Sequence, residues 1–219
     1  MTFYTPEEDK KTSYSDFDED KKLPYVLLIG DSISQGYTKM VRENLKNVAN
    51  ILRPQTNCGD TLNGIKNINA WLGKRTWDIV HFNWGLHDLC YRHPDSKVYG
   101  NRDKINGKIS VTPDQYADNL EQLIEIMLPR SKRLIWCNTT YVPEKEAGRH
   151  VGDDVKYNNI AQNIMASHDI PTDDLYSLSS SFGPELFVAE GDVHFVPKGM
   201  TILARQVSDT IQREIGFLY

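Results

Sequence analysis

The chain has 219 residues, a formal net charge of −5 and ordinary fractions of apolar and charged residues. This length suits one domain with a sizeable core, and the acidic balance disfavours a nucleic-acid partner, which would need a basic patch. No apolar run approaches the roughly 18–20 residues of a membrane span, so we expect no membrane partner either.

The first 22 residues are polar and acidic and lack the apolar core of a signal peptide. We predict that residues 1–22 form a tail or a surface arm ahead of a folded domain at 23–219. Candidate anchors of this arm are Phe3, Tyr4, Tyr14 and Phe17. The pattern indicates a cytoplasmic protein if the chain is complete, and a periplasmic or secreted one if a leader was removed before this numbering begins.

Short apolar runs alternate with segments of helical periodicity from residue 23 onward. In chain order, the pattern predicts a strand at 24–29, a helix at 33–46, a strand at 48–52, a helix at 61–72, a strand at 77–83, a helix at 113–128, a strand at 133–138, a helix at 153–167, a short strand from 170 towards 175 and a closing helix at 197–215. Strands separated by helices of this length predict parallel βαβ units. We therefore expect an α/β, three-layer αβα sandwich around a five-stranded parallel sheet of flavodoxin-like order 2-1-3-4-5.

Two long connections, 84–112 and 139–152, each follow a predicted strand. Both are rich in Gly, Asn, His, Arg and Tyr, and loops of this length in a compact domain are usually functional. Because open α/β sheets bind ligands at the carboxyl ends of their strands, we expect both connections beside the ligand.

The turn Gly30-Asp31-Ser32-Ile33-Ser34 joins the first predicted strand to the first predicted helix. A serine there directs its hydroxyl at the binding crevice, and the helix N-terminus behind it suits a developing oxyanion. The turn differs from the G-x-S-x-G elbow of α/β-hydrolases, because Ser34 replaces the second glycine. Taken alone, this turn leaves two interpretations of Ser32, a nucleophile or a helix N-cap.

Three further polar segments follow strands on the same rim or precede the last helix: Asn57-Cys58-Gly59-Asp60-Thr61, Gly85-Leu86-His87-Asp88 and Gly191-Asp192-Val193-His194. In this order and spacing, the four segments resemble the blocks of the SGNH, or GDSL-type, hydrolases. The resemblance runs from about residue 23 to the C-terminus and implies a serine esterase or acylhydrolase domain. It implies Ser32 as nucleophile and His194 as its base, with the backbone N–H groups of Ser32 and Gly59 in the oxyanion hole.

The third and fourth segments depart from the family pattern. The family usually has Gly-x-Asn-Asp in the third block, whereas His87 stands here in the place of the asparagine. A neutral imidazole can donate one N–H, so His87 is a candidate third oxyanion donor, and the alternative is a packed rim residue. Asn83 is a further candidate donor, although its place at a strand end favours a role in tying the loop.

The family's acid usually stands three residues before the base, where this chain has Gly191. We favour Asp192 as the group that orients His194, because an acid would fix the required tautomer. Glu190, or a Ser-His dyad with no acid, remains the alternative. Asp31, Asp60 and Asp88 are expected to brace their turns.

Candidate substrate-binding residues on the long connections are Arg149, Trp84 and Tyr141. Aromatic planes beside an arginine suit a sugar or another polar substrate better than a long lipid chain, although the same residues could pack the loops. His81 falls inside a strand and is interpreted as structural.

Together, the residues and the resemblance predict a serine esterase that hydrolyses a short-chain acyl ester, with O-acetyl on a carbohydrate as the preferred example, through an acyl-enzyme. Two alternatives stay open: an acyltransferase using the same site, and a non-catalytic carbohydrate-binding protein on an esterase scaffold. The expected partner is a small-molecule or carbohydrate ester. The cysteines Cys58, Cys90 and Cys137 form no zinc-binding or disulfide pattern. The expected reaction needs neither a metal nor an organic cofactor, so we expect none.

Overall fold

The computed structural model describes residues 19–219. The candidate anchors of the predicted arm, Phe3, Tyr4, Tyr14 and Phe17, lie outside the described residues, as does the rest of 1–18. Asp20 is held against the second strand, because its backbone N–H donates to Asn50 Oδ1 (2.9 Å) and its carbonyl accepts from Asn50 Nδ2 (2.8 Å).

The centre of the molecule is a five-stranded sheet in which every adjacent pair is parallel. Its strands are β1 (Tyr25–Ile29), β2 (Asn50–Leu52), β3 (Trp77–Phe82), β6 (Ser131–Cys137) and β7 (Thr172–Asp173), in the order β2-β1-β3-β6-β7. This is the predicted order 2-1-3-4-5 with the strands renumbered, so the expected fold is confirmed. Both faces of β1 and β3 are covered, which explains their continuous apolar sequences.

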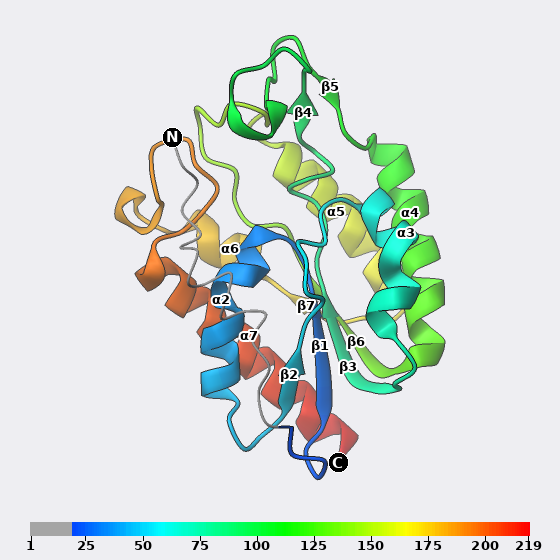
Figure 1. The fold of residues 1–219 in the computed structure, drawn as a ribbon. Coiled ribbons are helices and arrows are strands. Elements are labelled where there is room, and N and C mark those ends of the chain that lie inside the picture. Colours follow the sequence, from blue (N-terminus) through cyan, green and yellow to red (C-terminus); the bar gives the residue numbers. More distant parts are fainter. Residues whose placement is uncertain (1–18) are drawn as a thin grey trace.

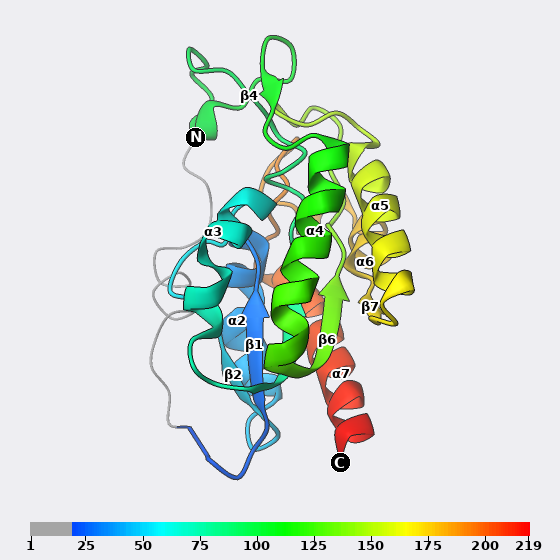
Figure 2. The same ribbon diagram turned by 90° about the vertical axis from the view of Figure 1, so that its right-hand side faces the viewer.

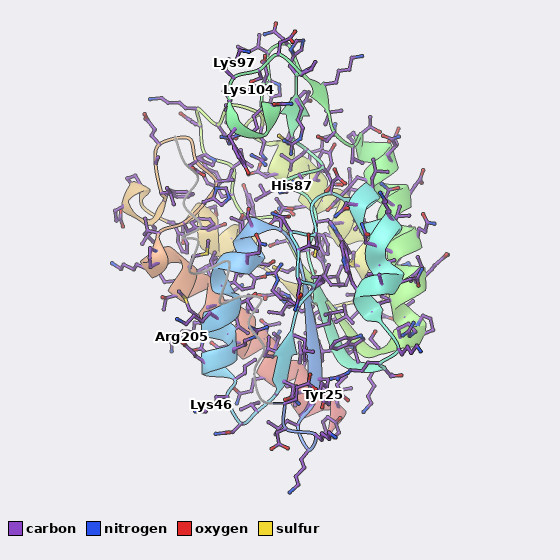
Figure 3. All side chains as sticks on the ribbon, in the orientation of Figure 1. Tyr25, Lys46, His87, Lys97, Lys104 and Arg205 are labelled. Carbon is purple, nitrogen blue, oxygen red and sulfur yellow. The ribbon has the colours of Figure 1, made fainter. Side chains whose placement is uncertain are left out.

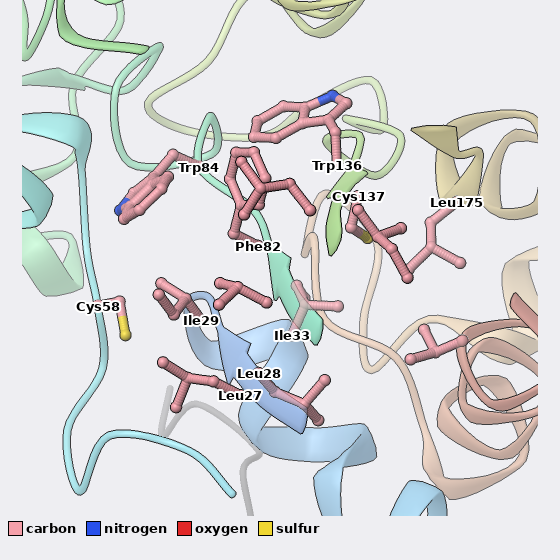
Figure 4. Close-up of a cluster of buried hydrophobic side chains, with 14 of the residues drawn as sticks. Leu27, Leu28, Ile29, Ile33, Cys58, Phe82, Trp84, Trp136, Cys137 and Leu175 are labelled. Atoms are coloured by element: carbon pink, nitrogen blue, oxygen red, sulfur yellow. The ribbon is translucent and has the colours of Figure 1, made fainter. Parts of the chain in front are cut away.

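Helices cover the two faces of the sheet and complete the three layers (Figures 1 and 2). On one face α2 (Ser32–Asn44) packs against α7 (Pro197–Leu218), and on the other α4 (Pro113–Met127) lies between α3 (Thr61–Leu72) and α5 (Asp153–Ser167). Between the layers lies a buried apolar cluster that includes Leu28, Phe82 and Trp136 (Figure 4). No helix within residues 19–219 has the length and apolar character needed to cross a membrane.

Several short elements were not predicted from the sequence. The predicted strand at 170–175 is only the two-residue β7, and helix α6 (Leu175–Ser180) follows it directly. Three short 3₁₀ helices also occur within residues 19–219, η1 (Tyr99–Asn101), η2 (Leu128–Arg130) and η3 (Pro184–Leu186). Such elements carry too little periodicity to be distinguished from loop in a single sequence.

The connection 84–112 forms a small antiparallel ribbon of β4 (Tyr91–Arg92) and β5 (Lys108–Ile109), which projects beyond the sheet at the top of Figure 1. It joins the other long connection through backbone hydrogen bonds, from Tyr91 N to Gly148 O (2.6 Å) and from Lys104 N to Ala147 O (2.9 Å). The two connections therefore form one structure beside the carboxyl ends of the strands.

Candidate active site

The turn between β1 and α2 places Ser32 at the first position of the helix. The N-cap is Asp31, whose carboxylate accepts a hydrogen bond from the backbone N–H of Ile33 at 2.9 Å. The capping interpretation of Ser32 is therefore wrong, and the hydroxyl of Ser32 is left for another partner. A Cβ atom at Gly30 would lie 2.9 Å from the Ser34 side chain, so this tight turn needs glycine.

Ser32 and His194 come together although 162 positions separate them in the chain. Ser32 Oγ lies 2.8 Å from Nε2 of His194, and Nδ1 of the same ring lies 2.6 Å from Asp192 Oδ1. The histidine is 8% exposed, which shields the two contacts from bulk water. This hydroxyl–imidazole–carboxylate series has the geometry that serine nucleophiles use.

Asp192 reaches the ring because the preceding residue turns the chain. Gly191 has a φ of +74° in the left-handed region, and a Cβ there would lie 2.7 Å from Lys145 O. The Asp192 carboxylate also accepts the backbone N–H of His194 (2.9 Å), which fixes the short loop. Burial acts to raise the pKa of Asp192, but the hydrogen bonds and charge of His194 outweigh it and lower that pKa below its ordinary value. The alternative acid, Glu190, is exposed and pairs with Lys145 instead (2.6 Å).

The two predicted backbone donors of the oxyanion hole, the N–H groups of Ser32 and Gly59, differ in whether another group already accepts their hydrogen bond. The N–H of Ser32 belongs to the first turn of α2, where helix N–H groups lack an intrahelical acceptor. The N–H of Gly59, in contrast, donates to the side-chain oxygen of Asn57 at 2.9 Å. Gly59 has a φ of +64°, which explains the glycine, but its donor is occupied by this Asx turn.

The half-buried ring of His87 lines the same cavity as Ser32 and His194. Figure 3 shows it beyond the sheet, between the helical layers. No side-chain hydrogen bond of His87 occurs among residues 19–219. Burial chiefly lowers its pKa, to about 4; Asp31 opposes this shift, and Arg149 and Arg92 reinforce it. At neutral pH the ring is therefore a neutral imidazole with one N–H available for donation.

Asn83 and Asp88 have structural partners. Asn83 Nδ2 donates to the carbonyl of Cys137 at 2.7 Å, which ties the residue after β3 to the end of β6 rather than to the following loop. Asp88 accepts from the backbone N–H (2.9 Å) and the hydroxyl (2.5 Å) of Thr61. The Asp88 contact therefore joins the loop that carries His87 to the start of α3.

A cavity of about 150 Å³ opens beside Ser32 and His194. Of the three predicted substrate-binding residues, the structure brings only Arg149 to its wall. Trp84 is fully buried in the core, where it lies near Phe82 (Figure 4). The prediction that Trp84 binds the substrate is therefore wrong. Tyr141 packs against Tyr176 and Phe187 and does not line the cavity.

Sequence reasoning missed several other residues of the cavity wall, among them Gln35, Asn57, Arg92 and Arg102. Gln35 lies one turn of α2 beyond Ser32, so helical spacing was a usable signal. Asn57 is the first residue of the segment 57–61 that resembles a family block, so its place in the sequence was also a usable signal. Arg92 and Arg102 had only the general signal that long connections after strands carry function.

One group of side chains within residues 19–219 has metal-ligand geometry: His81, Cys137 and Asp173, all buried, offer ligand atoms within 4.8 Å of one another. Asp173 already binds His81 Nε2 (3.0 Å) and Gln206 Nε2 (2.9 Å). Burial, the largest effect, and nearby carboxylates raise the pKa of the Cys137 thiol, which opposes the thiolate that a metal requires. The group fits the structural role predicted for His81, joining β3, β7 and α7.

Comparison with family models and with curated protein sequences gave no match. Solved structures do match. A lipase/acylhydrolase from Enterococcus faecalis has a TM-score of 0.70 at 20% identity, covering 87% of this chain and 96% of that one. A GDSL-like lipase from Bacteroides thetaiotaomicron has a TM-score of 0.67 at 12% identity, with coverages of 94% and 96%. An acetylxylan esterase from Geobacillus stearothermophilus has a TM-score of 0.65 at 15% identity, with coverages of 88% and 94%.

These similarities extend over nearly the whole of each matched structure. Because the sequence identities are low, they describe the arrangement of the backbone. They agree with the strand order and the layers described above. The chain therefore has the three-layer α/β fold of the GDSL-type, or SGNH, lipases and acylhydrolases.

Proposed function

We propose that this chain is a serine esterase that removes a short acyl group from an ester through an acyl-enzyme. The observation that carries the proposal is the hydrogen-bonded series from Asp192 through His194 to Ser32. A serine hydroxyl is a weak nucleophile until a base within hydrogen-bond reach takes its proton, and a carboxylate on the far ring nitrogen holds the base in the required tautomer.

In the proposed reaction, Nε2 of His194 takes the proton of Ser32 as Oγ attacks the carbonyl carbon of the ester. The tetrahedral oxyanion accepts hydrogen bonds from the N–H of Ser32, from the neutral ring of His87 and, once its bond to Asn57 is exchanged, from the N–H of Gly59. His194 then returns the proton to the leaving alcohol, which leaves an acyl group on Ser32. Water, activated by the same histidine, releases the acid and restores the serine.

The size of the cavity supports a short acyl group. An enclosed apolar cavity of about 150 Å³ accommodates a molecule of the size of benzene, whereas a long acyl chain needs more room. The cavity here has the same volume but includes polar and charged side chains, which disfavours a lipid. Two of the structural neighbours are described as acetyl xylan esterases, and O-acetyl on a carbohydrate is the substrate that we propose.

The test compares p-nitrophenyl acetate with p-nitrophenyl palmitate, using the wild type, Ser32→Ala and the control Ser180→Ala. Ser180 is an exposed serine on α6. We expect turnover of the acetate ester, a loss of at least about 10³-fold in kcat for Ser32→Ala and no loss for the control. Equal activity of the Ser32 variant and the wild type, or no activity on either ester, would overturn the proposal.

A second measurement addresses the acyl-enzyme and the acceptor. A fluorophosphonate probe should label the wild type at Ser32, as read by peptide mass spectrometry, and leave Ser32→Ala unlabelled. Adding an acceptor alcohol to the acetate assay distinguishes hydrolysis from acyl transfer. An esterase forms mainly free acetate, whereas a dominant transfer product would replace hydrolysis by the transferase alternative.

A further inference from the structure

Three arginine side chains line the cavity beside Ser32: Arg92 and Arg102 from one long connection and Arg149 from the other. Glu146 is completely buried and pairs with two of them, through Arg149 Nη1 at 3.0 Å and through Arg102 Nη1. The carboxylate of Glu146 is therefore shared by two guanidinium groups. The one carboxylate on the cavity wall within residues 19–219, that of Asp31, is already the N-cap of α2.

Arg92 contributes a positive charge that no carboxylate among residues 19–219 neutralises by an ion pair. Its side chain is nevertheless held in place, because Nε donates to Ser110 Oγ (3.2 Å) and Nη1 donates to the carbonyl of Gly100. Gly100 has a φ of +71°, and a Cβ there would lie 3.0 Å from Nη1, so the loop is shaped around this guanidinium.

Arg149 is also fixed and lines the same cavity as Ser32 and His194. It is 5% exposed, its Nε donates to the carbonyl of Leu86 (2.7 Å), and no hydrogen bond within residues 19–219 uses its Nη2. Arg149 and Arg92 line the same cavity wall as His87, the proposed oxyanion donor, and their positive charges help to lower its pKa. A guanidinium held in this way keeps the N–H groups of Nη2 for charge-assisted hydrogen bonds to an oxyanion such as a carboxylate or a sulfate.

We propose that the substrate of this site is an ester that carries a second, anionic group, a carboxylate or a sulfate, and that Arg92 and Arg149 bind that group. This inference rests on the proposed esterase function and adds a substrate class to it. Binding of the anion supplies the negative charge that Arg92 lacks in an ion pair within residues 19–219 and positions the ester carbonyl against Ser32. Neutral acetate esters enter the same cavity without this anchor and react more slowly.

The test uses acetate esters of matched phenols. The anionic esters are 4-acetoxybenzoate and 4-acetoxybenzenesulfonate, and the neutral one is 4-acetoxybenzamide, with each rate divided by that of hydroxide-catalysed hydrolysis. We expect a kcat/KM for the better anionic ester at least about tenfold above that of the amide, since charge-assisted hydrogen bonds are the strong ones. The two anionic esters distinguish a planar carboxylate site from a tetrahedral, sulfate-like one.

The variant Arg92→Gln should remove most of this preference, lowering kcat/KM for the better anionic ester at least about fivefold more than kcat/KM for the amide. Arg205→Gln provides the matched control, because it removes an equal charge from an exposed position on α7 (Figure 3). Equal normalised rates for all three esters, or equal losses on anionic and neutral esters in Arg92→Gln, would overturn the anionic-substrate proposal alone. No hydrolysis of any ester by the wild type would instead count against the esterase function.

Discussion

The side-chain oxygen of Asn57 lies 2.9 Å from the backbone nitrogen of Gly59, so a cavity-lining amide occupies the N–H that the family resemblance assigns to the oxyanion hole. For Gly59 to stabilise a transition state, this bond has to exchange for one to the substrate oxyanion. Because Asn57 is neutral, the exchange costs one ordinary hydrogen bond, about 1 kcal/mol.

An aspartate in place of Asn57 would make the exchange much harder. We expect Asn57→Asp to lower kcat by at least about tenfold, because a carboxylate holds the Gly59 N–H more strongly and places a negative charge beside the oxyanion. Asn57→Ala, which frees the N–H, should keep at least about half of the wild-type kcat. Steady-state kinetics on p-nitrophenyl acetate measures both, and similar losses in the two variants would show that the bond has no catalytic effect.

His87 provides a test of the third oxyanion donor. We expect His87→Ala to lower kcat by more than about tenfold, whereas His87→Asn, which retains an N–H donor, should lose less. Burial lowers the pKa of His87 to about 4, so the ring stays neutral above about pH 5. The ratio of the wild-type kcat to that of His87→Asn should therefore be constant from about pH 5.5 to 9. A change in this ratio centred near pH 6.5, the ordinary histidine pKa, would contradict the assignment.

We expect Asp192 to act in catalysis mainly by fixing the orientation and tautomer of the His194 ring. Asp192→Asn would place an amide against Nδ1 and favour the wrong tautomer, and we expect kcat to fall by about 10³–10⁴-fold. The control is Glu190→Gln, an exposed carboxylate paired with Lys145, which should leave kcat unchanged. A small loss at Asp192 would indicate that a Ser-His dyad suffices, and a large loss at Glu190 would reassign the acid.

Asp88 is expected to make stability depend on pH. Burial raises its pKa to about 7, against about 3.9 in an unfolded chain, and one of its buried oxygens has no hydrogen-bond partner within residues 19–219. Between these values the folded protein holds a proton that the unfolded chain has released. The contribution of Asp88 to the free energy of unfolding therefore falls as the pH rises from about 4 to 7.

Asp88→Asn removes this titration while keeping an oxygen for Thr61. We expect its melting temperature, relative to that of the wild type, to rise between pH 5 and pH 7.5 and to change little above. Thermal unfolding by circular dichroism measures this, with Asp169→Asn as the control at an exposed position. A difference in melting temperature that does not depend on pH would show that Asp88 is ionised throughout this range.

Most of the fold could be predicted because its elements are long and periodic. The apolar runs of β1 and β3 and the amphipathic helices between strands suffice for a parallel sheet and its order. The short strands could not be predicted because they lack such length. β4, β5 and β7 have two residues each, and their positions depend on residues far away in the sequence. The burial of Trp84 could not be predicted either, because an aromatic residue at a strand end suits a substrate pocket or a core equally well until its surroundings are known.

The sequence by itself determined the sheet, the rim at its carboxyl edge and the residue types of the proposed site, because hydrophobic periodicity and local turn chemistry act over a few residues. Only the tertiary structure decided which groups meet across that rim. The turn at Gly191 brings Asp192 onto His194, the contact between the two long connections places Arg92 and Arg149 in one cavity, and Asn57 engages Gly59. These relationships depend on distances of a few ångströms between side chains, which backbone geometry and packing set and which no pattern along a single chain encodes.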